Sequence, residues 1–217
     1  MQSDVHVPLF PLKMVLFPGE ETALHIFEPR YQAMLKRCLS EKMPFCLVHA
    51  DADTGIAGVA TMAHVVEVVE AFEDGRSNIR IRGGLRVQIK EQIPGAPSYD
   101  QARVFPLLDR HARVDSATLD RVISLHMKLL EVVGHEVRPA IYEKKDSLLR
   151  FLVHNAGLTT ADKQRVLECD HDLDRYVWLQ RHMERLIPKL QKEQAFTQRV
   201  RQNGYFRDYN NPTSGED

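Results

Sequence analysis

The sequence predicts an α+β protein in which a small β-rich barrel with one inserted helix precedes an α-helical bundle. Up to about residue 109, short runs rich in Val, Ile and Phe are interrupted by Gly, Pro and Asp-Gly, which is the pattern of antiparallel strands and tight turns. Beyond that point, apolar residues recur every three or four positions, as on one face of a helix. We therefore expect a barrel over residues 1–110, a helical subdomain over 111–204 and a tail over 205–217.

Short apolar runs define the expected strands of the first half. Asp74-Gly75 predicts a tight hairpin turn, because this pair accepts the positive φ of a type I′ turn. Gly83-Gly84 predicts a bulge or a sharp bend. About eight short strands with one helix among them favour a closed or nearly closed barrel. The apolar runs cover residues 5–10, 14–17, 22–27, 45–49, 56–61, 64–72, 79–82, 85–90 and 100–108.

One helix is expected among these strands. Pro29 suits a first helical position, where its missing N–H costs nothing. The apolar residues that follow have the spacing of one helical face, and a proline lies just past their end. These apolar residues are Tyr31, Met34, Leu35, Cys38 and Leu39.

The second half carries signals for four helices. Asp115 or Ser116 is expected to cap the first of them. Thr159 with Asp162 resembles a capping box ahead of a later, short helix. A long helix begins near residue 172, and Pro188 is expected to kink it or end it.

A spaced motif near the N-terminus resembles the opening of Lon N-terminal, or substrate-binding, domains. It consists of PLFPL at 8–12, LFPG at 16–19 and LHIFEPRY at 24–31. Further on, DGR at 74–76 and GLRV at 84–87 are similar to a later segment of the same family. Residues 152–168 are similar to its helical part, so the resemblance covers most of the chain from residue 5 to about residue 190.

The resemblance implies a barrel of the kind shared with PUA-like domains, followed by a helical bundle. In full-length Lon, an ATP-dependent protease (protease La), this region helps to recognise unfolded or tagged substrates and to assemble the hexamer. The resemblance therefore implies a protein-recognition module that binds unfolded or exposed apolar segments of other proteins, by groove or sheet-edge contact.

The sequence predicts no catalytic residues, metal ligands or cofactor. None of the eleven glycines is followed by Lys, so the phosphate-binding GxxxxGK[ST] loop is absent, and so are HExxH and GxSxG. The resemblance ends before a protease segment with its Ser-Lys pair. Cys169 and His171 offer only two potential metal ligands. An enzyme with an unrecognised site between barrel and bundle remains as an alternative.

Phe27, Arg30 and Tyr31 are the candidate peptide-binding residues. They lie where a strand gives way to a helix, and they could form one wall of a cleft. The competing interpretation is architectural. In it, Glu28 lies near the positive end of the helix dipole, Arg30 pairs with Glu28, and Tyr31 packs on the apolar face of the helix.

A set of basic residues suggests nucleic acid as an alternative ligand. Period-two spacing places them on the faces of two adjacent strands, where they would form a basic stripe suited to RNA. No aromatic residue that could stack on bases lies in this stretch, and the competing interpretation is a solvated face paired with Glu67, Glu70 and Glu73. The basic residues are Arg76, Arg80, Arg82, Arg86 and Lys90.

Net charge and cysteine content bear on the class of partner and on the cellular compartment. The formal net charge is −1, so no overall field favours nucleic acid or an anionic membrane. The three cysteines form no CxxC pair, and no apolar run is long enough for a membrane span or a secretion signal. We expect a cytoplasmic protein whose partners are other proteins.

Overall fold

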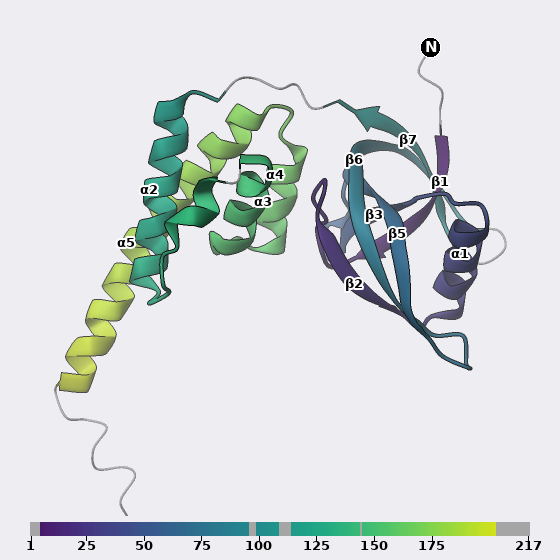
Figure 1. Ribbon diagram of the computed structural model, residues 1–217, viewed down its shortest axis with the longest axis horizontal. Coiled ribbons are helices and arrows are strands. Elements are labelled where there is room, and N and C mark those ends of the chain that lie inside the picture. Colours follow the sequence, from purple (N-terminus) through teal and green to yellow (C-terminus); the bar gives the residue numbers. More distant parts are fainter. Residues whose placement is uncertain (1–4, 96–98, 109–113, 144, 203–217) are drawn as a thin grey trace, which may run out of the picture.

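The computed structural model describes residues 5–95, 99–108, 114–143 and 145–202, and these form two lobes (Figure 1). The predicted tail at 205–217 and the predicted boundary at residue 110 lie outside these ranges. The first lobe contains β1 (Val5–Leu12), β2 (Glu21–Ile26), α1 (Pro29–Ser40), β3 (Phe45–Asp51), β4 (Gly55–Ile56), β5 (Val59–Ala71), β6 (Ser77–Ile93) and β7 (Gln101–Leu107). The second contains α2 (Ser116–Val132), the 3-10 helix η1 (Pro139–Glu143), α3 (Lys145–Asn155), α4 (Thr160–Glu168) and α5 (Asp172–Gln202).

The strand pairings close a ring, as the sequence predicts. β1 pairs in parallel with β3 and antiparallel with β7, and antiparallel pairs join β3 to β5, β5 to β6 and β6 to β7. One apolar cluster receives side chains from all five of these strands, which identifies it as the barrel interior. Its buried members are Val7, Leu9, Cys46, Val48, Ala60, Met62, Val87, Ala102 and Val104.

A second apolar core lies between the outside of this barrel and helix α1. The helix has the predicted apolar face, with Tyr31, Met34, Leu35 and Cys38 buried, although Leu39 is 43% exposed. β2 contributes to the same core and pairs with the first part of β6. α1 and β2 therefore cover one side of the β5–β6 hairpin.

Three expected strand assignments were wrong. The apolar run 14–17 is a loop, in which Val15 and Phe17 insert into the core of the helical lobe while Leu16 is buried in the core next to α1. The runs on either side of residues 62–63 and of Gly83-Gly84 are not separate strands. They form the continuous strands β5 and β6, which carry bulges instead of breaks.

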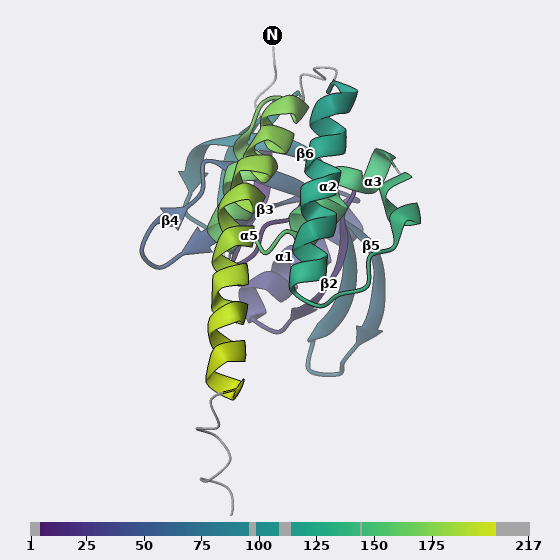
Figure 2. The ribbon, with the colours of Figure 1, turned by 90° about the vertical axis from the view of Figure 1, so that its left-hand side faces the viewer.

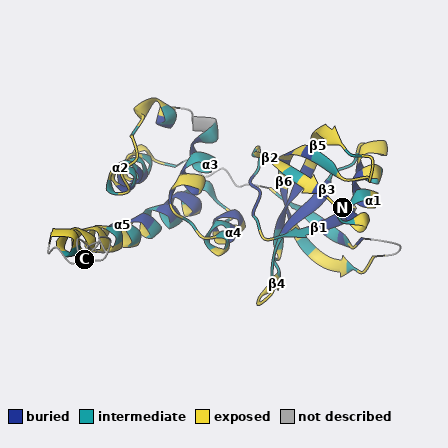
Figure 3. Cartoon of the chain, turned by 90° about the horizontal axis from the view of Figure 1, so that it is seen from below, coloured by how far each residue is buried: buried dark blue, intermediate teal, exposed yellow. Residues whose placement is uncertain are grey.

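The helical lobe largely follows its sequence signals. Asp115 caps α2 by accepting from the Thr118 backbone N–H, and the predicted capping box of Thr159 and Asp162 is present at α4. α2 and α5 pack side by side (Figure 2). Pro188 does not end α5, which continues to Gln202 with its last part largely exposed (Figure 3). No helix among the described residues is both long and apolar enough to cross a membrane.

Direct polar contacts join the two lobes. Gln164 in α4 donates through Nε2 to the Val59 carbonyl in β5 at 2.9 Å. Arg86 in β6 donates through Nη1 to the carbonyl oxygens of Leu167 and Cys169 at the end of α4. With Val15 and Phe17 in the helical core, these contacts fix the orientation of the lobes.

Candidate functional site

The strand-to-helix junction does not present Phe27, Arg30 and Tyr31 on one open wall. Tyr31 is only 6% exposed and packs edge-on against Phe10 with ring centroids 4.4 Å apart. Arg30 pairs with Glu28 at 2.8 Å and lies over the Tyr31 ring. Phe27 is 58% exposed and stacks on His25. Tyr31 and Arg30 thus have the architectural contacts, and Phe27 alone offers an accessible apolar side chain.

The outward arginines of β6 are paired with carboxylates. Arg80 lies 2.9 Å from Glu67, and Arg82 hydrogen-bonds Glu21, which lies on the adjacent strand β2. The hydrogen bond from Arg82 lowers the pKa of Glu21 from its usual 4.5. Arg76 pairs within the hairpin turn with Asp74 at 2.6 Å, and the Lys90 ammonium lies 5.8 Å from the centre of the Phe105 ring. The face at Arg80 and Arg82 is therefore a mixed-charge surface with little excess positive charge for phosphates.

Arg86 is not part of that face, which corrects the predicted basic stripe. Gly83 pairs with Ala63, and Arg86 pairs with Thr61. The two residues between them on β6, Gly84 and Leu85, therefore lie opposite the single β5 residue Met62. This extra residue reverses the alternation of side chains. Arg86 therefore lies on the face opposite to Arg80 and Arg82, where it is 2% exposed against the helical lobe.

The same bulge shapes an apolar pocket at one mouth of the barrel. The pocket has a volume of about 240 Å³ and its floor belongs to the barrel interior. Leu85, the second bulge residue, is 59% exposed at the rim. This barrel mouth was not predicted from the sequence, because its residues come from four separate segments, and the one signal for it was Gly83-Gly84. It is lined by Pro44, Met62, His64, Leu85, Val87, Val104 and Pro106.

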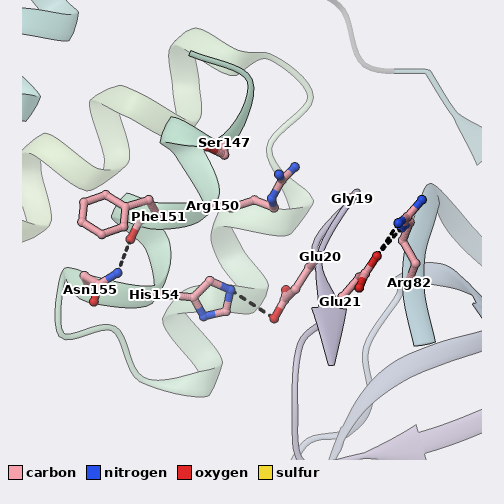
Figure 4. A pocket seen from close by; sticks show the side chains of 9 residues that line it. All are labelled: Gly19, Glu20, Glu21, Arg82, Ser147, Arg150, Phe151, His154 and Asn155. Carbon is pink, nitrogen blue, oxygen red and sulfur yellow. Dashed lines mark hydrogen bonds and ion pairs between the residues drawn. The ribbon is translucent and has the colours of Figure 1, made fainter. Parts of the chain in front are cut away.

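A second, polar cleft of about 690 Å³ separates β2 from α3 (Figure 4). Glu20 binds His154 across it, with Oε1 and Nε2 3.1 Å apart, and accepts from the Phe17 backbone N–H. Arg150 donates to the Pro18 carbonyl at 3.2 Å, and among the described residues it has no carboxylate partner. This interlobe cleft is lined by Gly19, Glu20, Glu21, Arg82, Ser147, Arg150, Phe151, His154 and Asn155.

Burial raises the pKa of each thiol, and the described residues contain no metal-binding cluster. Burial raises the pKa of Cys38 to about 11 and that of Cys46 to about 12, so both remain protonated at neutral pH. Burial also raises the pKa of Cys169, whose Sγ donates to the Arg165 carbonyl. Within the described ranges, no group of three His, Cys, Asp or Glu side chains could hold a metal ion.

The profile of the ATP-dependent protease La (LON) substrate-binding domain matches residues 6–185. A Lon protease of Cytophaga hutchinsonii is 26% identical, over 85% of this chain and 25% of that protein. A LON peptidase N-terminal domain and RING finger protein of Schizosaccharomyces pombe is also 26% identical, over 81% of this chain and 44% of that protein. The chain thus spans less than half the length of these relatives.

Solved structures show the same fold. A Lon N-terminal domain protein from Xanthomonas campestris superposes with a TM-score of 0.63 at 19% identity, over 85% of this chain and 98% of the other. The N-terminal domain of a Mycobacterium avium complex Lon protease gives a TM-score of 0.59 at 18% identity, over 83% of this chain and 98% of the other. At these identities the likeness concerns the arrangement of strands and helices.

Proposed function

The chain belongs to the ATP-dependent protease La (LON) substrate-binding domain family, and from that membership we propose that it is a non-catalytic protein-recognition module that binds exposed apolar segments of other proteins. The observation that carries the proposal is the barrel mouth. Its lining is almost entirely aliphatic, apart from His64, and Leu85 extends it outward at the rim.

The barrel mouth suits one large apolar side chain of an unfolded client. Its volume of about 240 Å³ has room for an aliphatic or aromatic group. Full burial of such a side chain contributes about 1.5–3 kcal/mol, enough for weak and reversible capture of a single segment. Several such segments on one unfolded chain would raise the apparent affinity in proportion to their number, because each offers the barrel mouth another chance to bind.

The polar groups favour binding over catalysis. In the interlobe cleft, Glu20 is held by His154 and the Phe17 N–H, and Glu21 is held by Arg82. The thiols are buried in their protonated form. All three cysteines are free, which supports action in the reducing cytoplasm.

The test is binding of a labelled, reduced and carboxymethylated protein that cannot refold, measured by fluorescence anisotropy. Leu85→Gln should weaken binding roughly three- to tenfold, because it removes part of one apolar contact. Leu39→Gln is the matched control, since Leu39 is also an exposed leucine but lies on α1, away from the barrel mouth. Absence of binding by the unchanged protein, or equal losses in the two variants, would contradict the proposal.

A further inference from the structure

Strand β2 has one edge free for pairing. Among the described residues, β2 pairs with β6 alone. Glu21 faces Arg82, and the Gly83 N–H donates to the Glu20 carbonyl, which makes Glu21 and Arg82 a non-hydrogen-bonded pair. The alternation along an antiparallel ladder then directs the backbone N–H and C=O groups of Glu21, Ala23 and His25 away from β6.

The free edge of β2 is more regular than that of β5. Beyond residue 63, β5 has no partner other than β6 within the described ranges. Register shifts at Val65/Glu67 and Val68/Glu70 interrupt that stretch, and such bulges discourage further pairing. The six pairs between β2 and β6 run without interruption, and β2 contains neither Pro nor Lys, two residues that commonly protect edges.

The two ends of this edge differ in chemistry. At its start, β2 borders the interlobe cleft, which Glu21 and Arg150 of α3 both line, while the Glu21 side chain itself points to Arg82 (Figure 4). The Arg150 guanidinium has a carbonyl partner and no carboxylate partner among the described residues. At its other end, His25 contacts the rings of Phe27 and Phe72, and Phe27 is exposed. A strand lying along β2 would therefore have a cation at one end and aromatic rings at the other.

We propose that an extended segment of a client protein binds this module by adding a strand antiparallel to β2. Its backbone pairs with Ala23 and His25, and an acidic side chain near its C-terminal end pairs with Arg150 in the interlobe cleft. The direction follows from the stronger antiparallel ladder and from the course of β2, which leads out of the cleft. Residues nearer the N-terminus of the segment contact Phe27. This mode rests on the proposed function and adds how the client is held.

Backbone pairing suits a module that accepts many clients. Main-chain hydrogen bonds are independent of sequence, so they supply affinity to any segment that can extend, while alternate side chains supply selectivity. Unfolded chains provide such segments, whereas folded proteins have paired their own strands. The acidic position adds a preference without restricting the rest of the sequence.

The direct test is amide hydrogen exchange followed by NMR, with the blocked peptide acetyl-Val-Thr-Val-Thr-Val-Asp-amide as the probe. In the free protein, the amides of Thr22, Leu24 and Ile26 should exchange slowly, and those of Ala23 and His25 should exchange fast. Saturating peptide should slow exchange at Ala23 and His25 by at least roughly tenfold. Peptide that binds without this change overturns the strand addition and leaves the proposed function standing. Failure of this peptide and of unfolded protein to bind contradicts both.

A variant of the edge gives an independent readout. Ala23→Pro removes an outward N–H and no bond to β6, so peptide affinity should fall about tenfold, while Ala23→Val keeps the donor and the affinity. If Ala23→Pro does not fold, N-methylated peptides replace it. N-methyl groups on the peptide edge that faces β2 should abolish binding, because they remove the paired N–H groups. N-methyl groups on the opposite edge should have no effect. Equal effects at all positions would contradict an added strand.

Arg150 is tested by coupling. The peptide ending in Asp should bind roughly three- to tenfold more tightly than the same peptide ending in Asn, and Arg150→Gln should remove this difference. The Asn peptide should bind wild type and Arg150→Gln equally. Equal binding would show that losing the contact of Arg150 with the Pro18 carbonyl does not itself weaken peptide binding. A difference that persists in Arg150→Gln overturns this part of the proposal. A stable dimer in light scattering, dissociated by the peptide, would identify a second copy as the occupant of β2.

Discussion

The two halves of β6 place the same residue type in opposite environments. Before the bulge, Arg80 and Arg82 extend into solvent and pair with carboxylates of neighbouring strands. After it, Arg86 is buried between the lobes, where it binds carbonyl oxygens at the end of α4. The difference arises from one extra residue in the ladder, because a bulge exchanges the two faces of a strand. Whether an arginine of β6 is exposed or buried therefore depends on how β6 pairs with β5, and cannot be read from its spacing along the sequence.

The largest expected effect is that of Arg86→Met. It removes the charged donor from the Leu167 carbonyl, whereas Arg175 still donates to the Cys169 carbonyl. We expect the free energy of unfolding to fall by about 3 kcal/mol, since hydrogen bonds from charged groups are strong and an orphaned buried acceptor is costly. Urea denaturation measures this change.

Arg82→Met is the matched control for Arg86→Met. It breaks an exposed ion pair with Glu21, and such pairs contribute little to stability because solvent screens them. Equal losses of stability in the two variants would mean that the bulge does not separate the environments of the two halves of β6.

Gly83→Ala tests the junction between the halves and should have an intermediate effect. A Cβ at this position would lie 2.2 Å from the Phe17 carbonyl oxygen, so the backbone of the loop that carries Phe17 must move. Overpacking of this kind costs about 1–3 kcal/mol. Gly58→Ala is the control, because an added Cβ there meets nothing within 4 Å. A denaturation midpoint unchanged by Gly83→Ala would show that this close approach does not fix the loop.

The sequence predicted the helix caps and the hairpin turn, because these features depend on residues that are close together in the chain. The capping box of Thr159 and Asp162 forms within one helical turn. A tight turn forms at Asp74-Gly75, but only Gly75 has a positive φ, so it is not the type I′ turn that the sequence predicted. The loop at 14–17 was mistaken for a strand because an apolar run records burial and not pairing. Val15 and Phe17 are buried by helices that follow more than a hundred residues later in the sequence.

The candidate sites depended on contacts that sequence spacing cannot supply. The two-residue period of a strand, continued across Gly83-Gly84, predicted that Arg86 shares a face with Arg82. The prediction failed because the bulge inserts one extra residue. The barrel mouth unites residues from Pro44 to Pro106, and the free edge of β2 exists because of which strands pair. Of the predicted peptide-binding residues, Phe27 alone is an exposed ring, since the helix turns Tyr31 inward.

The smallest expected effect concerns pH and the exposed half of β6. The hydrogen bond from Arg82 lowers the pKa of Glu21 in the folded state below the ordinary value of 4.5. The pair therefore stabilises the folded protein above that value, and this contribution is lost as the pH falls through the lowered pKa. Wild type and Arg82→Met should differ slightly in urea midpoint at about pH 7, and the difference should shrink as the pH falls through the lowered pKa of Glu21.

Glu21→Gln is the matched control for this pH dependence, because it removes the titrating group itself. It should resemble Arg82→Met near neutral pH, apart from the longer contact of Glu21 with Arg80 at 3.7 Å. On acidification its midpoint relative to that variant should therefore change less than the midpoint of wild type does. A gap between wild type and Arg82→Met that stayed constant across this range would mean that Arg82 acts through contacts other than Glu21. In that case the solvent-facing half of β6 would contribute structure as the buried half does, and the contrast between the two halves would be one of degree.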